Sequence, residues 1–192
     1  TTTLCTPRDL AYRIDKAAIA AVITDEENAR KIDEIADQCP TLKQKFILGA
    51  ASGSWISFEE SMANESQCLL VSDKTRHDDP MLLYFTSGTV AYPKMVVHTQ
   101  ASYGIGHLIT AKFWQDVHPE DMQWTITDTG WAKIAWGALF GQWTIGARIF
   151  VQNCLKYEPK TILKLLESAG ITIFCAPPTA YRILVQEDLK KY

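Results

Sequence analysis

The sequence lacks closely spaced cysteine or histidine pairs, although it contains five cysteines and four histidines. Such pairs are typical of structural zinc sites, and an even number of cysteines is typical of small disulfide-bonded domains. Neither pattern is present, so we predict no metal site in the chain itself and a reducing compartment. The cysteines are Cys5, Cys39, Cys68, Cys154 and Cys175, and the histidines are His77, His98, His107 and His118.

The sequence also lacks an excess of positive charge and a long apolar run. Nineteen Lys and Arg residues stand against 22 Asp and Glu residues, which gives a formal net charge of −3. Domains that neutralise many nucleic-acid phosphates are basic instead. The longest uncharged stretch, residues 134–147, is shorter than the about 20 apolar residues of a membrane-spanning helix. We therefore predict neither a nucleic-acid partner nor a membrane span.

Short apolar runs alternate with amphipathic segments along the chain. This alternation predicts an α/β fold with largely parallel sheets flanked by helices, and 192 residues allow a sizeable core. The expected strands are residues 20–23, 46–48, 81–85, 95–98, 123–126, 147–151 and 171–175. The expected helices follow Thr6, Asp25 and Ser57 and include residues 102–113, 131–143 and 159–166, with a last helix capped by Thr179.

Two of these helices carry specific signals. Thr6-Pro7-Arg8-Asp9 has an N-cap residue, a proline at the first helical position and an acidic residue that completes a capping box. The segment from Trp131 to Trp143 is apolar on nearly all sides. An all-round apolar helix is typical of a buried position, so we expect this helix to be buried.

The most informative segment for function is residues 84–94, Tyr-Phe-Thr-Ser-Gly-Thr-Val-Ala-Tyr-Pro-Lys. A loop of small residues after a strand can turn backbone N–H groups toward an anion, hydroxyl groups donate further hydrogen bonds, and a lysine adds positive charge. The segment is not a G-x-x-x-x-G-K-[ST] loop, and residues 104–106 lack the third glycine of the dinucleotide fingerprint. The residues thus indicate a polyphosphate-binding loop, with a β-turn carrying a solvated lysine as the alternative.

This segment resembles the phosphate loop of the AMP-forming acyl-CoA synthetases, which belong to the adenylate-forming superfamily. That loop reads Thr-Ser-Gly-Thr-(Ser/Thr)-Gly-x-Pro-Lys. Val90 and Ala91 depart from it, because the family has a hydroxyl residue and a glycine at these positions. The matching residues are Thr86, Ser87, Gly88, Thr89, Pro93 and Lys94.

Two further segments carry the resemblance along the chain. Residues 127–131, Thr-Asp-Thr-Gly-Trp, and residues 175–182, Cys-Ala-Pro-Pro-Thr-Ala-Tyr-Arg, are similar to the medium-chain acyl-CoA synthetase branch. With these segments the resemblance covers essentially all 192 residues. It implies that the chain is part of the large N-terminal domain of an adenylate-forming enzyme.

The resemblance also implies an activity, that of an acid–thiol ligase. A fatty or aromatic carboxylic acid attacks ATP to give acyl-AMP, and coenzyme A then displaces AMP, with Mg²⁺ as the metal cofactor. Because a carboxylate is already ionised at pH 7, catalysis needs positioning and charge stabilisation rather than a general base. By resemblance, Lys94 is the catalytic residue, and the residues that hold the ATP phosphates are Thr86, Ser87, Gly88, Thr89 and Lys94.

The resemblance further implies that Trp131 lines the acyl or coenzyme A side of the site. The alternative is a core tryptophan, since Ile134 and Trp136 follow closely. Tyr103 and His107 lie on the helix after the loop. In some relatives an aromatic residue near such a place reaches the acyl chain, but this sequence does not decide the point.

Several motifs of the family have no counterpart here: the aromatic-Gly-x-Thr-Glu segment, the ribose-binding Asp and the Lys of a mobile C-terminal domain. We therefore expect residues 1–192 to be a partial AMP-binding domain without the C-terminal domain, inactive on its own. One alternative is a decayed copy that keeps only a binding or interaction role, and another is an unrelated phosphate-binding domain. The expected location is the cytoplasm, or the mitochondrial matrix if the source is eukaryotic.

Overall fold

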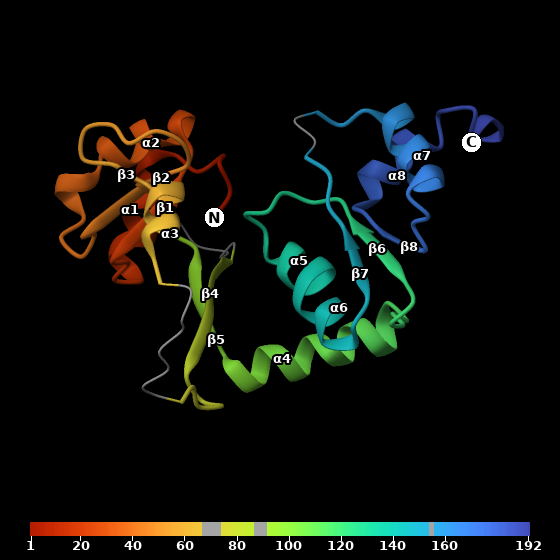
Figure 1. Cartoon of the computed structure of the whole chain (residues 1–192), viewed down its shortest axis with the longest axis horizontal. Helices are drawn as coiled ribbons and strands as arrows, with labels where there is room; N and C mark the ends of the chain where they lie inside the picture. Colours follow the sequence, from red (N-terminus) through yellow and green to blue (C-terminus); the bar gives the residue numbers. More distant parts are fainter. Residues whose placement is uncertain (67–73, 87–91, 154–155) are drawn as a thin grey trace. The chain divides into compact units, whose positions relative to one another are not determined.

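The computed structural model describes residues 1–66, 74–86, 92–153 and 156–192 (Figure 1). The chain forms two compact units. We call Thr3–Arg76 with Leu83–Val97 the N-terminal unit, and Thr1–Thr2, His77–Leu82 and His98–Tyr192 the C-terminal unit.

The N-terminal unit contains a small parallel sheet in the strand order β1-β2-β3. Ala21 lies opposite Gln44, and Phe46 lies opposite Ile56. Its elements are α1 (Pro7–Lys16), β1 (Ala21–Thr24), α2 (Glu26–Asp33), a 3₁₀ helix (Ala36–Gln38), β2 (Gln44–Ile47), β3 (Ile56–Ser57) and α3 (Phe58–Asn64).

Helix caps and one apolar cluster define this unit. The Thr6 side chain accepts a hydrogen bond from the Asp9 backbone N–H, and the Asp9 carboxylate accepts one from the Thr6 N–H, so the predicted capping box is confirmed. Asp25 and Ser57 cap α2 and α3, also as predicted. The core of this unit consists of Ile14, Ala29, Ile32, Ile35, Cys39, Ile47 and Trp55.

Two strands, β4 (Pro80–Thr86) and β5 (Lys94–Thr99), pair with each other and run from one unit into the other. Parallel neighbours need a connection of a dozen or more residues. Because only residues 87–93 connect these strands, we infer that they pair antiparallel. The predicted phosphate loop therefore connects the strands of a β-hairpin.

The C-terminal unit contains a second parallel sheet in the strand order β7-β6-β8. Its elements are α4 (Gln100–Ile109), the π-helical segment η2 (Thr110–Trp114), β6 (Met122–Thr125), α5 (Ala132–Ile134), the π-helical segment η3 (Ala135–Leu139), α6 (Phe140–Ile145), β7 (Arg148–Phe150), α7 (Pro159–Ser168), β8 (Ile173–Cys175), α8 (Pro178–Leu184) and a 3₁₀ helix (Leu189–Lys191).

Apolar clusters pack on this second sheet. One cluster combines Trp124 of β6 with Ile162 of α7 and Leu184 of α8. Ile173 of β8 packs instead against a cluster that includes Ala111 of η2. Side chains alternate between the faces of a strand, so these clusters cover opposite faces. The prediction of an α/β fold with parallel sheets flanked by helices is confirmed in both units.

Two local predictions are wrong. The helix expected over residues 131–143 is present as the consecutive segments α5, η3 and α6, but it is not buried on all sides, because Trp131 and Trp143 are more than 60% exposed. Thr179 does not cap the last helix. Its N-cap is Pro177, and Pro178, whose φ is preset for a helix, occupies the first helical position.

Candidate functional site

The hairpin brings together two of the predicted phosphate-binding residues. Thr86 ends β4 and Lys94 begins β5, and the Thr86 hydroxyl donates a hydrogen bond to the Lys94 carbonyl oxygen at 3.4 Å. Both residues are exposed. A hydroxyl group and an ammonium group at neighbouring strand ends are suitable donors for a phosphate. The other predicted phosphate-binding residues, Ser87, Gly88 and Thr89, lie outside the described residues.

Two residues of α1 that the sequence analysis did not single out also contact this hairpin. The Tyr12 hydroxyl donates a hydrogen bond to the Pro93 carbonyl oxygen at 3.1 Å. The Arg8 guanidinium donates one to the Tyr92 hydroxyl at 2.9 Å. These contacts join residues about 80 positions apart, so no local sequence signal indicated them.

The turn before α5 presents Trp131 to solvent. The Asp128 carboxylate accepts hydrogen bonds from the Gly130 N–H at 2.6 Å and from the Thr2 hydroxyl at 3.1 Å, and the Trp131 N–H donates to the Asp128 carbonyl oxygen at 3.1 Å. The Trp131 side chain is 61% exposed. The Trp131 side chain therefore does not belong to the core formed by the described residues.

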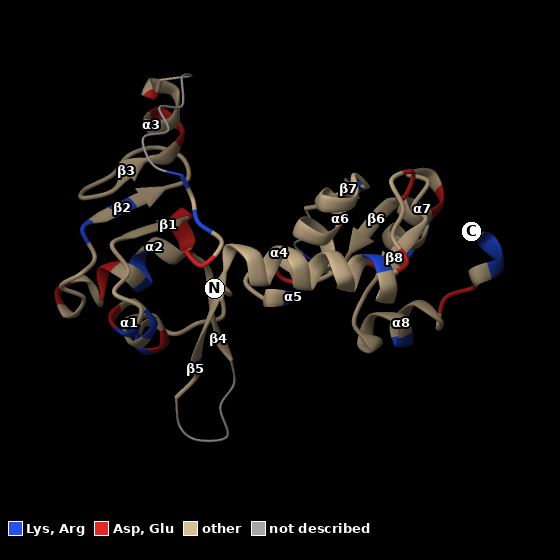
Figure 2. Cartoon of the chain, turned by 90° about the horizontal axis from the view of Figure 1, so that it is seen from below, with Lys and Arg blue, Asp and Glu red and all other residues tan. Residues whose placement is uncertain are grey.

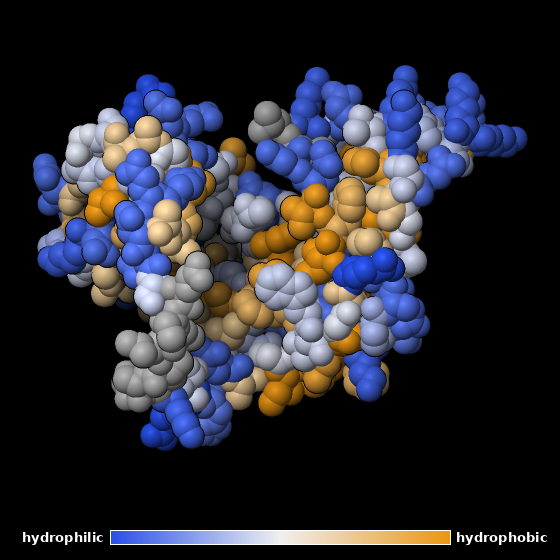
Figure 3. All heavy atoms as spheres, in the orientation of Figure 1, coloured by the Kyte–Doolittle hydropathy of each residue, from blue (hydrophilic) through white to orange (hydrophobic). Residues whose placement is uncertain are grey.

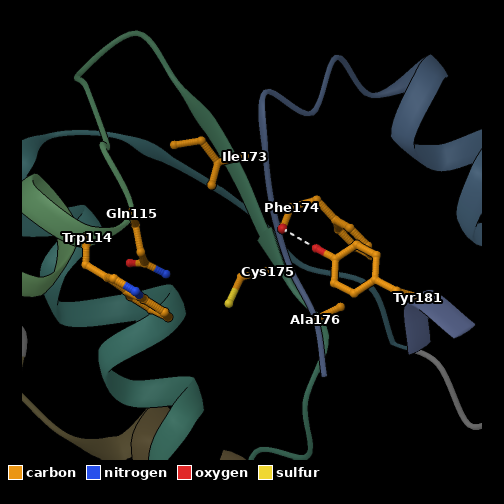
Figure 4. Close-up of a pocket in the computed structure, with 7 residues that line it drawn as sticks. All are labelled: Trp114, Gln115, Ile173, Phe174, Cys175, Ala176 and Tyr181. Atoms are coloured by element: carbon orange, nitrogen blue, oxygen red, sulfur yellow. Dashed lines mark hydrogen bonds between the residues drawn. The ribbon is translucent and has the colours of Figure 1, made fainter. Parts of the chain in front are cut away.

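A pocket of about 300 Å³ lies in the C-terminal unit between η2 and β8 (Figure 4). Gln115 and Cys175 extend into the same space in this view, and the Tyr181 hydroxyl is engaged by donating to the Phe174 carbonyl oxygen at 2.8 Å. The residues lining the pocket are Trp114, Gln115, Ile173, Phe174, Cys175, Ala176 and Tyr181. Ligands of open parallel sheets bind outside the carboxyl ends of the strands, which is where Cys175 and Ala176 lie.

The polar group of this pocket is the Gln115 amide. Its Oε1 accepts a hydrogen bond from Gln142 Nε2 at 2.8 Å. Its Nε2 is buried and has no hydrogen-bond partner among the described residues. A buried donor without a partner is costly, so this nitrogen is a local cost to stability in the described structure rather than a group that the open pocket exposes.

Gln115 is held by a buried polar network under the sheet. Gln142 Nε2 also donates to Gln123 Oε1 and to the Gly137 carbonyl oxygen, and Thr125 donates to that same carbonyl. Gly137 lies in the π-helical segment η3. Side chains thus donate hydrogen bonds to the Gly137 carbonyl oxygen where the helix departs from α geometry. Such π-helical turns are frequent at functional sites.

Tyr103 and His107 form an aromatic cluster on α4. Tyr103 is 1% exposed, and its ring lies 4.1 Å from the His107 ring. Burial, together with the positive charge of His98, lowers the pKa of His107 below its ordinary value. Tyr103 is therefore a core residue in the described structure. Within residues 1–66, 74–86, 92–153 and 156–192, no three His, Cys, Asp or Glu side chains come together as a potential metal site.

The surface of the chain shows how charged and hydrophobic residues are distributed. Acidic and basic residues are interspersed over both units (Figure 2), and hydrophobic residues are exposed over α4 and over α5 and α6 (Figure 3). The exposed hydrophobic residues of α4 and η2 are Ile105, Ile109, Phe113 and Trp114. In the part of the chain that the structure describes, no helix has the length and apolar character needed to cross a membrane.

Comparisons with known proteins agree with the resemblance. Residues 2–192 match the family of AMP-binding enzymes. The mitochondrial acyl-coenzyme A synthetase ACSM3 of Homo sapiens is 39% identical over 195 residues, which cover 100% of this chain and 33% of that protein. The mitochondrial acyl-coenzyme A synthetase ACSM4 of Rattus norvegicus is 39% identical over 191 residues, which cover 97% of this chain and 32% of that protein.

Solved structures show the same fold. The crystal structure of the anthranilate CoA ligase AuaEII in complex with anthranoyl-AMP matches with a TM-score of 0.84 at 20% identity, over 98% of this chain and 38% of that chain. The crystal structure of Brucella canis acyl-CoA synthetase matches with a TM-score of 0.80 at 22% identity, over 95% of this chain and 33% of that chain.

The chain thus spans about a third of the length of these curated relatives. The alternative of an unrelated domain with a coincidental loop is wrong, because the match runs through nearly every residue rather than through the loop alone. The predicted resemblance is confirmed, and the chain belongs to the family of AMP-binding enzymes.

Proposed function

We propose that the protein containing this chain activates a carboxylic acid with ATP and transfers the acyl group to coenzyme A. The carboxylate oxygen attacks the α-phosphorus of ATP, and pyrophosphate leaves. The thiol sulfur of coenzyme A then attacks the acyl carbon of acyl-AMP, AMP leaves, and the thiol proton is released. Family membership together with the positions of Thr86 and Lys94 is the observation that supports this proposal most strongly.

In this proposal the residues at the ends of the hairpin bind the phosphates of ATP. Lys94 offsets the negative charge of the departing pyrophosphate, and the Thr86 hydroxyl donates to a phosphate oxygen. Ser87, Gly88 and Thr89 belong to the same proposed site by resemblance. A positioned cation and donors of this kind lower the barrier because their charge complements the charge that develops in the transition state.

The metal cofactor of the proposed reaction is Mg²⁺. The described residues provide no cluster of three metal-ligating side chains. Mg²⁺ is commonly held by substrate phosphates, water and one or two carboxylates, so we expect it to enter with ATP. Its chemical contribution would be to neutralise phosphate charge.

The acid has two candidate positions in the C-terminal unit. The exposed indole of Trp131 is one, as the resemblance implies. The pocket at the end of β8 is the other, because its walls include the aromatic side chains of Trp114, Phe174 and Tyr181. Both positions suit a fatty or aromatic acid, since each offers apolar surface.

Relatives named as mitochondrial favour the mitochondrial matrix over the cytoplasm as the site of action.

A second function, nucleotide binding without ligation, is favoured by Val90 and Ala91, which replace a hydroxyl residue and a glycine of the family loop. Both residues lie outside the described part of the structure.

The test separates binding from chemistry in the natural gene product that contains these residues. MgATP binding is measured by calorimetry, and acyl-AMP formation is followed by ATP–pyrophosphate exchange with a panel of saturated fatty acids and benzoate. Acid-dependent exchange supports the ligase. Binding without exchange for any acid favours the binding module, and no MgATP binding overturns both functions.

A further inference from the structure

One side chain of α1 contacts both ends of the phosphate hairpin. The ring of Tyr12 stacks on Tyr92 with centroids 4.7 Å apart and planes at 27°, and it meets the edge of Phe85 at 6.1 Å. Its hydroxyl donates to the Pro93 carbonyl oxygen. Phe85 directly precedes Thr86, and Pro93 directly precedes Lys94. Tyr12 therefore touches the neighbours of both described phosphate-binding residues.

Two arginines of α1 also contact aromatic residues of the hairpin, Tyr92 and Phe85. The Arg8 guanidinium donates to the Tyr92 hydroxyl and lies 6.0 Å from the centre of the ring. The Arg13 guanidinium lies 5.0 Å from the centre of the Phe85 ring, within the range of a cation–π interaction. Arg8 and Tyr12 are four residues apart, so they lie on one face of α1.

Helix α1 is itself anchored in the N-terminal unit. Its first turn is held by the Thr6–Asp9 capping box, and Ile14, which is 3% exposed, belongs to the core cluster of the unit. Leu10 and Ala11 pack against the same cluster. A side chain on an anchored helix can fix the position of a neighbouring strand end more precisely than a side chain on a loop can.

We propose that Tyr12 and Arg8 are positioning residues that hold Thr86 and Lys94 in register for phosphate binding. The inference rests on the proposed function of the hairpin. Phosphoryl and adenylyl transfer depend on the placement of donors to within a fraction of an ångström, and small displacements reduce the rate strongly. Tyr12 and Arg8 act through Pro93, Tyr92 and Phe85 and need not touch ATP.

The test compares three variants of the natural gene product. Tyr12→Phe removes the hydrogen bond to Pro93 and keeps the ring, and Arg8→Gln removes the charge beside Tyr92. Tyr157→Phe is the matched control, because Tyr157 is also half-buried and its hydroxyl donates to a backbone oxygen, that of Ala180, at 2.9 Å. Tyr157 belongs to the C-terminal unit, whereas Arg8, Tyr12, Phe85, Tyr92 and Pro93 all belong to the N-terminal unit.

Two measurements are made on each variant at a temperature well below its Tm. Amide hydrogen exchange is measured on peptides from the described hairpin strands, and KM is measured separately for MgATP and for the acid. We expect faster exchange in these strands and an about 3- to 10-fold higher KM for MgATP in Tyr12→Phe and Arg8→Gln. We expect an unchanged KM for the acid in both variants. In Tyr157→Phe we expect neither faster exchange in the hairpin strands nor a higher KM for MgATP.

The outcomes separate this inference from the proposed function. If wild-type protein neither binds MgATP nor uses it, the proposed function fails, and the inference that depends on it fails as well. If wild-type protein uses MgATP but Tyr12→Phe and Arg8→Gln leave both its KM and strand exchange unchanged, only the positioning role is wrong. An equal rise of KM in Tyr157→Phe would also overturn it, because the effect would then be one of general stability.

Discussion

The buried side chain of Gln142 donates a hydrogen bond from Nε2 to Gln123 Oε1 at 2.9 Å, and neither residue exposes any surface. The same Nε2 reaches Gln115 Oε1 at 2.8 Å. Gln142 therefore connects a strand of the second sheet to the wall of the pocket. Amides buried in this way lose their hydrogen bonds to water, and the network replaces only part of them, because Gln115 Nε2 and Gln142 Oε1 have no partner among the described residues.

Replacement of Gln142 by leucine should destabilise the protein. Gln142→Leu leaves the oxygens of Gln123 and Gln115 without this donor, and a buried polar atom without a partner costs about 1–3 kcal/mol. The free energy of unfolding, measured by urea denaturation, should fall by that amount. Gln186→Leu is the control, since Gln186 is exposed. Equal stability of the two variants would show that the network contributes nothing.

A close approach of two helices makes a second position sensitive. A Cβ atom at Gly141 of α6 would lie 2.7 Å from the His107 carbonyl oxygen and 2.8 Å from Ala111 Cβ. Neither is the far end of a flexible side chain, so Gly141→Ala should destabilise by about 1–3 kcal/mol despite the better helix propensity of alanine. Gly104→Ala meets nothing within 4 Å and should gain up to about 1 kcal/mol. Thermal unfolding of the two variants should shift in opposite directions.

Local features of the fold were predictable from the sequence. The caps at Thr6, Asp25 and Ser57 depend on bonds to residues three positions away, so the sequence contains the whole signal. The π-helical segment at Gly137 was not predictable, because the side chains that donate to the Gly137 carbonyl oxygen come partly from β6, up to 14 residues away.

The site was predictable only where a motif is contiguous in the sequence. Thr86 and Lys94 belong to one segment, and the structure brings them together as strand ends. Tyr12 lies 81 residues from Pro93 in the sequence. Gln115 is likewise bound by a distant residue, because its Oε1 accepts a hydrogen bond from Gln142. Such contacts depend on tertiary packing, so neither composition nor periodicity can reveal them.

Lys94 should matter chiefly for ATP. A hydrogen bond to a charged group contributes about 1.5–3 kcal/mol, so Lys94→Ala should weaken MgATP-dependent pyrophosphate exchange by about 10- to 100-fold. Lys94→Arg keeps the charge and should retain part of the activity. Unchanged exchange in Lys94→Ala would identify Lys94 as a solvated turn residue, as the alternative interpretation of the loop has it.

Restoration of the family loop should improve nucleotide binding. Val90 lacks the hydroxyl donor of the family, and Ala91 carries a Cβ where the family has glycine, which disfavours positive φ and close approach of the backbone to a ligand. The first difference costs about 1–3 kcal/mol and the second about 1–2 kcal/mol, although effects of adjacent residues need not add. Val90→Thr combined with Ala91→Gly should therefore lower the Kd for MgATP. Equal Kd values, measured by calorimetry, would mean that the loop tolerates both departures.

His107 should make the stability of the protein depend on pH. Burial and the charge of His98 hold the pKa of His107 below its ordinary value of 6.5, and its Nδ1 is buried without a partner among the described residues. The unfolded chain therefore binds a proton at a higher pH than the native protein does. The free energy of unfolding should fall as the pH is lowered through about 6.5, until the native pKa is passed.

This effect can be separated from that of the carboxylates. The pKa values of Asp33 and Asp121 are lowered by hydrogen bonds and nearby charges despite opposing burial, so their contributions are lost only at pH values near and below the ordinary value of 3.8. His107→Gln removes the imidazole and should flatten the fall in unfolding free energy between about pH 7.5 and pH 5.5. An NMR titration of the His107 ring protons should give a midpoint below 6.5 in the native protein. A midpoint at or above that value, or an undiminished fall in the variant, would assign the pH dependence to other groups.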